Sequence, residues 1–137
     1  MSPMPSFSLS CHADAPLEDI WKLLHDPARF PEWMAGVETV EVGDARTAGT
    51  PYTMWPEGYP DFPMAQRLQV TPSGVTISCL VSDLVFRWTL SDGPGAGTTI
   101  GVEVEIPGSE SHRLADQKRL VADSLTRIAS LAERPTG

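Results

Sequence analysis

The sequence predicts an α+β domain in which a curved antiparallel sheet of seven strands surrounds a long C-terminal helix. Three observations favour this fold class. Between residues 37 and 106, most segments alternate apolar and polar side chains, which is typical of strands with one dry face. Short turns rich in Gly, Pro and Asp separate these segments, as in an antiparallel meander. The last segment, from about residue 111 to 133, carries its apolar residues at helical spacing instead.

The chain begins with a strand and two short helices. Alternation predicts the strand at residues 7–11. A helix then opens near Pro16 and ends at Pro27. Its apolar face consists of Leu17, Ile20, Trp21 and Leu24. The segment 28–34 forms at most one or two further helical turns, because Pro31 interrupts it.

Six strands and one long helix complete the predicted fold. The strands span residues 37–42, 51–55, 64–71, 75–81, 84–90 and 100–106. The apolar stripe of the helix consists of Leu114, Val121, Leu125, Ile128 and Ala132. A seven-stranded sheet has more apolar surface than one helix could cover by packing along its edge. We therefore expect the sheet to curl around the helix. The short helices would close one end, leaving a cavity with a lid of Phe30, Trp33 and Met34.

Length and charge limit the classes of partner. The chain has 137 residues, which suits a single domain spanning 1–137. Its formal net charge of −8 would repel a phosphate backbone, so we expect neither a nucleic acid nor a membrane as partner. The N-terminus has no basic, apolar signal segment, and no window is apolar enough to span a bilayer. We therefore expect a cytoplasmic protein.

Motifs for metals and nucleotides do not appear. Cys11 and Cys79 lie 68 residues apart, which indicates free thiols in a reducing compartment. His12, His25 and His112 are too scattered for a zinc motif, and there is no phosphate-binding glycine loop after a strand. We expect no metal and no cofactor.

The opening of the chain resembles a known family. Residues 15–21, then Leu24, Asp26 and residues 30–33, resemble the start of the polyketide cyclase/dehydrase and lipid-transport group of the START-like superfamily. The resemblance implies the helix-grip fold of the birch-pollen allergen (Bet v 1), and the order of elements agrees over nearly the whole chain. The superfamily includes aromatase/cyclases, ubiquinone-binding proteins, hormone receptors and carriers, so the fold alone does not determine the activity.

Aromatase/cyclases of this group carry three typical side chains in their pocket region. Where they have Trp-Pro-Glu, this chain has Phe30-Pro31-Glu32, and where they have a pocket tyrosine it has Val37. Their pocket arginine on a mid-sheet strand has its counterpart in Arg67. The arginine is thus the one side chain that the resemblance carries over directly.

Three residues are candidates for catalysis. The guanidinium of Arg67 could stabilise an enolate during an aldol closure, although alternation with Leu68 aims it outward unless a bulge lies near Pro63. A desolvated Asp61 could act as a base. Tyr59 could donate to a carbonyl from a Pro-rich loop that would gate the pocket. The alternatives are a solvated arginine and a packed surface loop.

Ten residues are candidates for substrate binding, mostly aromatic or flexible apolar side chains suited to a flat ligand. They are Phe30, Trp33, Met34, Tyr52, Trp55, Met64, Gln66, Phe86, Trp88 and Leu125. The alternative is that these side chains only pack the core.

We weigh three functions. The first is a polyketide cyclase, whose substrate arrives free or on an acyl carrier protein that docks on the basic residues Arg113, Lys118 and Arg119. The second is a non-catalytic carrier or sensor of a hydrophobic small molecule, and the third a scaffold filled by its own aromatics. Polar groups that converge in the pocket favour the cyclase, and a purely apolar lining favours the carrier. A homodimer is compatible with each.

Overall fold

The computed structural model describes residues 6–44, 49–95 and 97–133. In this part of the chain, a seven-stranded sheet has the order β1-β7-β6-β5-β4-β3-β2 and every pair is antiparallel. The strands are β1 (Ser6–Ala13), β2 (Val37–Val42), β3 (Thr50–Pro56), β4 (Met64–Thr71), β5 (Gly74–Cys79), β6 (Val85–Asp92) and β7 (Thr98–Glu105). The helices are α1 (Leu17–Leu24), η1 (Pro27–Arg29), α2 (Phe30–Trp33), η2 (Gly108–Arg113) and α3 (Leu114–Glu133).

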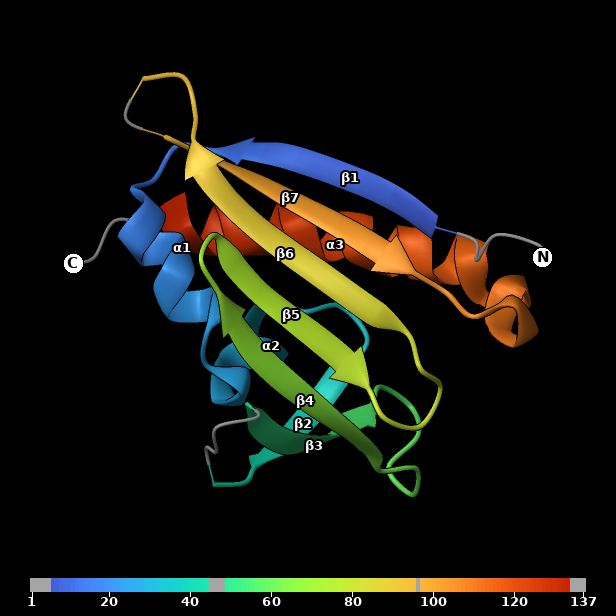
Figure 1. Ribbon diagram of the computed structural model, residues 1–137. Coiled ribbons are helices and arrows are strands. Elements are labelled where there is room, and N and C mark those ends of the chain that lie inside the picture. The colour runs from blue at the N-terminus through green and yellow to red at the C-terminus, as the bar shows by residue number, and fades with distance from the viewer. Residues whose placement is uncertain (1–5, 45–48, 96, 134–137) are drawn as a thin grey trace.

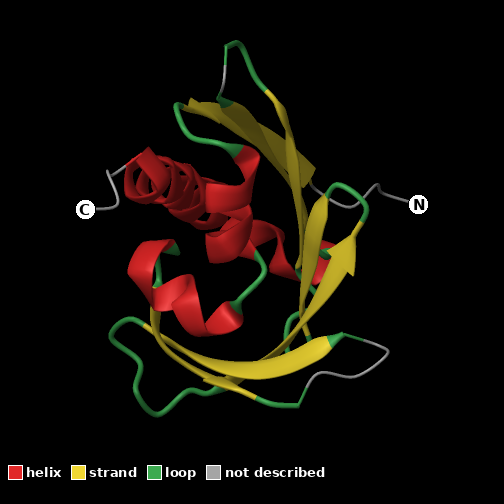
Figure 2. Cartoon of the chain, turned by 90° about the vertical axis from the view of Figure 1, so that its left-hand side faces the viewer, coloured by secondary structure: helices red, strands yellow, loops and turns green. Residues whose placement is uncertain are grey.

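The sheet curls around the helices. Figure 1 shows α3 running behind β1, β7 and β6, and Figure 2 shows the helices inside the curve of the sheet. The short helices α1 and α2 lie on the same concave side and cover the part of the sheet that α3 leaves free. The predicted fold class, a curved seven-stranded sheet around a long C-terminal helix, is therefore confirmed.

Alternation along the strands produces the dry face. Ile100, Val102 and Val104 of β7 are buried, and the residues between them face outward or are half-buried. Their partners on β1 follow the same parity, since Leu9 pairs with Val102 and lies against the same core. The core thus lies between the concave face and α3, as the period-two pattern requires.

The helix α1 is rotated relative to the expected face. Ile20, Leu23 and Leu24 are buried, whereas Leu17 is 36% exposed and Trp21 is half-buried. The buried face of α1 therefore includes Leu23, which was not expected, and the first turn of the helix, with Leu17, is partly in solvent. The helix ends before Pro27, where the sequence predicted its end.

Two predicted boundaries shift. The strand expected to reach residue 81 ends at Cys79, because Cys79 N donates to Leu84 O at 2.9 Å and closes a tight turn through Asp83, whose φ is 60°. This turn exposes Leu80 and Val81. The long helix expected from residue 111 begins as the 3₁₀ segment η2 and becomes α3 at Leu114.

Some expectations concern residues outside the described part. The connection between the predicted strands 37–42 and 51–55 falls partly there. Among the described residues, no helix has the length and apolarity needed to cross a bilayer. Within the same ranges, no three His, Cys, Asp or Glu side chains gather in a way that could hold a metal ion.

Candidate functional site

A cavity lies between the concave face of the sheet and the first half of α3. Its volume is about 150 Å³, and it is partly open to solvent. Its wall comes from the α2–β2 connection (residues 34–37), from β3 to β6, and from η2 and α3. Gly36 makes the connection possible, because its φ is +84° and Leu120 of the wall approaches its missing Cβ position to 3.3 Å.

Four aromatic residues pack against one another where Trp88 lines the cavity, a cluster that we call the closed end: Phe30, Trp33, Tyr52 and Trp88. All are at most 3% exposed. The rings of Phe30 and Trp33 meet edge to face with centroids 5.5 Å apart, and Trp33 meets Trp88 in the same way at 5.2 Å. Such pairs add to the free energy of burial beyond the area alone.

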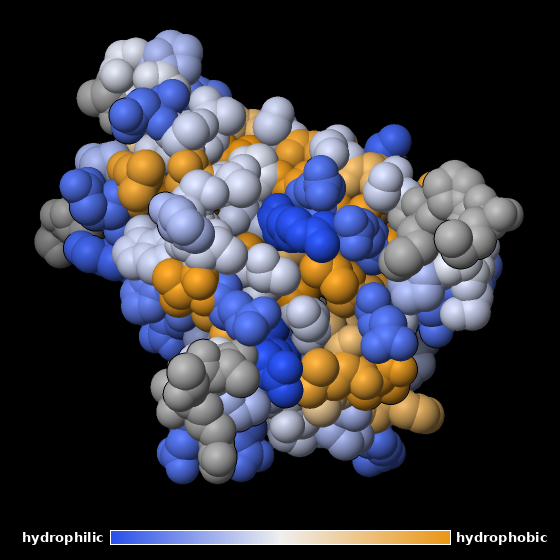
Figure 3. All heavy atoms as spheres, in the orientation of Figure 1, coloured by the Kyte–Doolittle hydropathy of each residue, from blue (hydrophilic) through white to orange (hydrophobic). Residues whose placement is uncertain are grey.

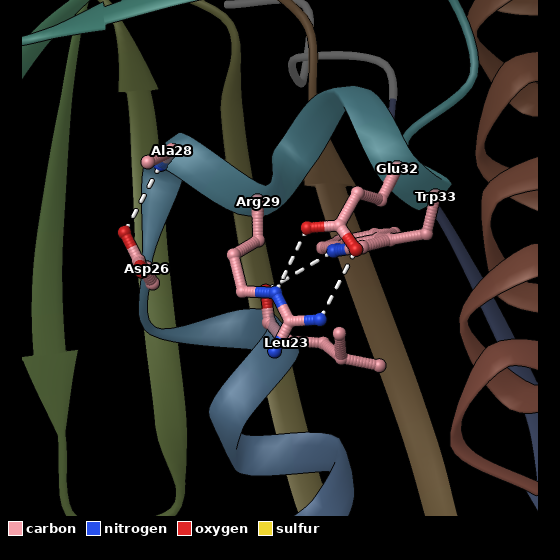
Figure 4. A network of polar contacts seen from close by, with 6 residues as sticks. All are labelled: Leu23, Asp26, Ala28, Arg29, Glu32 and Trp33. Atoms are coloured by element: carbon pink, nitrogen blue, oxygen red, sulfur yellow. Dashed lines mark hydrogen bonds and ion pairs between the residues drawn. The ribbon is translucent and has the colours of Figure 1, made fainter.

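Local hydrogen bonds fix the segment that supplies Phe30 and Trp33. Asp26 Oδ1 accepts from Ala28 N at 3.1 Å and caps η1. Arg29 donates to both carboxylate oxygens of Glu32, at 2.9 and 3.1 Å, and Trp33 Nε1 donates to Leu23 O at 3.1 Å (Figure 4). The apolar bulk of this segment therefore covers the end of the cavity and the core beneath it.

The Arg29–Glu32 pair changes the proton affinity of both groups but adds little stability. The hydrogen bond from Arg29 lowers the pKa of Glu32, and the same bond raises the pKa of Arg29. Both side chains are 40% or more exposed, and such surface pairs contribute about 1 kcal/mol at most. The pair orients the short helix rather than holding the fold together.

A buried polar pair lies on the sheet side of the cavity. Tyr52 Oη donates to Gln66 Oε1 at 2.5 Å, and the two residues are directly paired across β3 and β4. Burial, with a smaller contribution from Cys79, raises the pKa of Tyr52, so the phenol stays protonated and remains a donor. Gln66 lines the cavity, and its side-chain nitrogen makes no hydrogen bond within the described residues.

A second polar group lies toward the open side. Arg113 at the end of η2 and Gln117 one turn later both line the cavity. The Arg113 side chain is 31% exposed, and its guanidinium is held loosely by Glu110, with Nη1 and Oε2 3.9 Å apart. An arginine so placed can still donate to an oxygen of a molecule in the cavity.

Ser124 joins α3 to the other wall. Its hydroxyl accepts from Ala35 N at 2.9 Å and donates to Leu120 O at 2.8 Å. On the sheet side, Ser82 Oγ donates to Cys79 Sγ at 3.1 Å. The Ala35–Ser124 bond ties α3 to the α2–β2 connection, whereas the Ser82–Cys79 bond lies within the sheet side of the wall.

Exposed apolar side chains, which we call the mouth rim, lie on the two connections that border the cavity: Tyr59, Phe62, Leu80 and Val81. They are 47–66% exposed and lie on the β3–β4 and β5–β6 connections, whose ends, Pro56, Met64 and Ser82, line the cavity. Leu80 N donates to Ala65 O at 2.9 Å, which ties the β5–β6 connection to the start of β4. Figure 3 shows hydrophobic side chains at the lower right, where these connections lie in Figure 1.

The three catalytic candidates lie outside the cavity wall. Arg67 is on the outer face of β4, because the β3–β4 register is regular and Gln66 and Leu68 point inward. Its expected pocket position is therefore wrong: no bulge near Pro63 reverses the alternation. Tyr59 and Asp61 are exposed on the β3–β4 connection, outside the wall.

The binding candidates divide into three groups. Met34, Met64, Gln66, Phe86 and Trp88 line the cavity. Phe30, Trp33 and Tyr52 are buried behind the wall at the closed end. Trp55 and Leu125 were wrongly expected in the pocket: Trp55 lies on the outer face in a groove with Glu38 and Glu41, and Leu125 packs in the core.

Sequence reasoning assigned Leu125 of the last helix to the pocket and missed the residues of this helix and of η2 that line it. Arg113, Gln117, Val121 and Ser124 follow one another at spacings of four, four and three residues, so they share one helix face. That spacing was visible, but Arg113, Gln117 and Ser124 are polar and were not part of the apolar stripe.

The comparisons with known proteins agree with this architecture. A model of the family described as polyketide cyclase/dehydrase and lipid transport matches residues 13–118. No curated protein matches the chain in sequence.

Several solved structures share the fold at low identity. The ZhuI aromatase/cyclase from Streptomyces sp. R1128 has a TM-score of 0.80 and 14% identity, covering 96% of this chain and 94% of its own. Protein CV1439 from Chromobacterium violaceum has a TM-score of 0.72 and 20% identity, covering 97% and 100%. The di-domain aromatase/cyclase StfQ of the steffimycin pathway has a TM-score of 0.76 and 12% identity, and the match covers 93% of this chain and 50% of StfQ.

Proposed function

Because the chain belongs to the polyketide cyclase/dehydrase and lipid-transport family, we propose that it binds a hydrophobic small molecule in the cavity beside α3. The observation that carries this proposal is the cavity itself, about 150 Å³ of space with a mostly apolar wall that is partly open to solvent. Burying about 200 Å² of apolar ligand surface would contribute roughly 5 kcal/mol before association costs.

The size of the cavity limits what it encloses. An engineered apolar cavity of about 150 Å³ holds one benzene molecule, whereas pockets for larger ligands measure about 300–1,000 Å³. The enclosed part thus suits about one ring, and a longer ligand would continue through the mouth. Met34, Met54 and Met64 line the wall, and their flexible side chains can adapt to ligands of different shape.

No Asp, Glu or His is among the described residues that line the cavity, so its polar groups suit holding a ligand, as in a carrier or sensor, better than they suit proton transfer. Gln66, Ser82 and Arg113 are an amide, a hydroxyl and a guanidinium, which orient oxygen atoms by hydrogen bonds at neutral pH. The walls that carry them are fixed by the Tyr52–Gln66 and Ser124–Ala35 bonds. A fixed wall lowers the entropy cost of binding.

Native mass spectrometry of the protein purified from cells that produce it naturally is the direct test. We expect a co-purified small molecule with an apolar body. A companion titration with α-methylstyrene compares Ile77→Phe, which fills the cavity, with Thr76→Phe on the opposite face of β5. Ile77→Phe should weaken binding at least tenfold, and Thr76→Phe should bind like the wild type. Equal binding by both variants would place the ligand elsewhere.

A second candidate function is polyketide cyclisation, favoured by the position of Arg113 and Gln66 in one cavity. In an aldol closure, water would take a proton from a methylene, the enolate carbon would attack a second carbonyl, the resulting alkoxide would regain a proton, and loss of water would give the unsaturated ring. Both side chains could donate to the enolate oxygen. Orientation of a flexible chain can itself lower the barrier by roughly 7–11 kcal/mol.

The cyclase proposal has its own test. A linear poly-β-keto thioester is incubated with the protein, and the loss of one water is followed by mass spectrometry. We expect Arg113→Met to lower the rate about 10²-fold. Arg67→Met is the matched variant, because the family resemblance assigns the same role to Arg67. A rate equal to that in protein-free buffer would leave the binding function without catalysis.

A further inference from the structure

A groove on the outer face of the sheet combines an indole ring with two carboxylates. It measures about 520 Å³ and lies between the edge strand β2, the end of β3 and the β3–β4 connection. This volume lies within the range of sites for small molecules. Trp55 is half-buried in its wall. The other lining residues are Glu38, Thr39, Glu41, Pro56, Gly58 and Pro60.

A bulge in β2 brings the two glutamates into the same groove. On a regular strand, residues three apart face opposite sides of the sheet. In β2, however, Val37 pairs with Pro56 and Thr39 pairs with Trp55, so Glu38 is an extra residue between two pairs. The extra residue shifts the alternation by one position, and Glu38 and Glu41 both line the groove. The pairing of these carboxylates beside Trp55 therefore depends on the bulge.

The two carboxylates have no cationic partner in the part of the chain that the structure describes. Neither Glu38 nor Glu41 forms a side-chain hydrogen bond or an ion pair within residues 6–44, 49–95 and 97–133. Elsewhere on the outer face, Arg87 pairs with both Glu103 and Glu105.

The charge around the groove is also negative. Among the described residues that line it, none is basic. The sequence from residue 35 to 66 has five acidic residues and one basic residue. A groove of this kind attracts cations from solution.

We propose that this groove binds a small organic dication, such as a linear diamine, with one ammonium group at Glu38 and the other at Glu41. The carboxylates accept hydrogen bonds from the ammonium groups. The methylene chain lies along Trp55 and the prolines, and the indole face attracts the positive charge. This site is separate from the cavity beside α3, so the inference does not rest on the proposed binding function.

Two charges suit the groove better than one. A single ammonium group would leave one of the two carboxylates without a partner. Glu38 and Glu41 are three residues apart, which corresponds to roughly 10 Å of extended strand. A chain of six methylenes spans a comparable length, and the glutamate side chains are flexible enough to adjust to it.

The test uses three probes that differ only in charge. Hexane-1,6-diol, 6-aminohexan-1-ol and hexane-1,6-diamine share one chain and carry no, one and two positive charges at neutral pH. Each is titrated into the wild-type protein at low salt while the indole N–H signal of Trp55 is followed by ¹H–¹⁵N NMR. We expect the diamine to shift this signal saturably and to bind about fivefold more tightly than the amino alcohol. The diol should leave it nearly unshifted.

Variants that remove one charge complete the test. Glu38→Gln and Glu41→Gln should each reduce the affinity for the diamine to about that for the amino alcohol. Glu18→Gln removes the same charge from the exposed first turn of α1 and is the matched control. It should bind the diamine like the wild type. All three positions are exposed, so the variants should fold.

The possible results separate a site from general attraction. Equal affinity for the diamine and the amino alcohol in the wild type would overturn the inference. An equal loss of affinity in Glu18→Gln would overturn it as well, since the net charge of the protein and not the groove would then attract the probe. Retention of wild-type affinity by Glu18→Gln, with losses in the other two variants, would support the site. None of these results bears on the cavity, which Ile77→Phe tests separately.

Discussion

Two aromatic pairs in this protein have nearly the same local geometry and opposite surroundings. Phe30 and Trp33 are three residues apart, with ring centroids 5.5 Å apart and planes at 79°; Tyr59 and Phe62 have the same spacing, 6.1 Å and 78°. The first pair is 0% exposed, whereas Tyr59 is 59% and Phe62 66% exposed. Sequence spacing thus determines how the rings meet, and the tertiary contacts determine whether they are buried.

The difference lies in what covers each pair. The first pair is presented inward by α2, against Tyr52 and Trp88 of the concave face. The second lies on the β3–β4 connection at the mouth rim, beyond the edge of the core. We infer that the closed end stabilises the fold and that the mouth rim stabilises it little. The predictions below test this contrast.

The largest effect is expected at the closed end. Trp33→Ala removes a fully buried ring and its hydrogen bond to Leu23 O, so the free energy of unfolding should fall by about 3–5 kcal/mol. Chemical denaturation followed by circular dichroism measures it. Trp55→Ala, at a half-buried site on the outer face, should cost clearly less. Similar losses of unfolding free energy in both variants would mean that burial at the closed end stabilises the fold no more than the outer-face site does.

An intermediate effect is expected from the buried polar pair. Tyr52→Phe leaves Gln66 Oε1 without its donor, which should destabilise the fold by about 1–3 kcal/mol. Thermal unfolding of the two proteins at neutral pH measures this difference. An unchanged melting temperature would indicate that another donor reaches the amide.

The same tyrosine predicts a pH dependence. Burial raises the pKa of Tyr52 above its ordinary 10.0, so above pH 10 the unfolded chain releases this proton while the folded chain keeps it. The unfolded state then binds fewer protons, and the free energy of unfolding falls as the pH rises. Denaturation curves between pH 8 and 11 should show a steeper fall in the wild type than in Tyr52→Phe. Parallel curves would contradict this.

A smaller effect is expected at the open side. Arg113→Gln should weaken binding of 4-phenylbutyrate about fivefold, because the carboxylate of this probe would lie near the mouth and Arg113 is partly exposed to solvent. Calorimetry at low and high salt measures it, with the neutral amide of the same probe as control. If Arg113→Gln weakens binding of the acid and of the amide equally, Arg113 contributes by packing against the probe and not by its charge.

The smallest effect is expected at the mouth rim. Phe62→Ala should change the free energy of unfolding by less than about 0.5 kcal/mol, since the ring is mostly in solvent. Denaturation under the conditions used for Trp33→Ala gives the comparison directly. A loss above about 2 kcal/mol would mean that the rim packs against the core, and the contrast between the two pairs would fail.

The fold was predictable because the hydrophobic period of a segment and the turn residues beside it determine its secondary structure locally. Alternation placed Gln66 inward with Leu68, and it would have placed Arg67 and Trp55 outward had it been followed without exception. The pocket position of Arg67 came from the family resemblance, and the regular register of β4 overrules it. Where analogy and alternation disagree on a regular strand, alternation is the better guide.

The site was less predictable because it depends on contacts between distant segments. Nothing near Arg113 in the sequence says that η2 lies beside the mouth, nor that Ser124 bonds to Ala35, 89 residues away. The helix face of Arg113 and Gln117 could be recognised from spacing alone. Its position over the cavity follows from how α3 lies in the curled sheet, which only the three-dimensional structure provides.

The thioethers of Met34, Met54 and Met64 make the wall chemically sensitive as well as apolar. Peroxide converts a methionine to its sulfoxide, which is polar and chiral. Oxidation of these three side chains would turn a surface that attracts hydrocarbon into one that attracts water. A molecule held by apolar contacts with this wall would then bind more weakly.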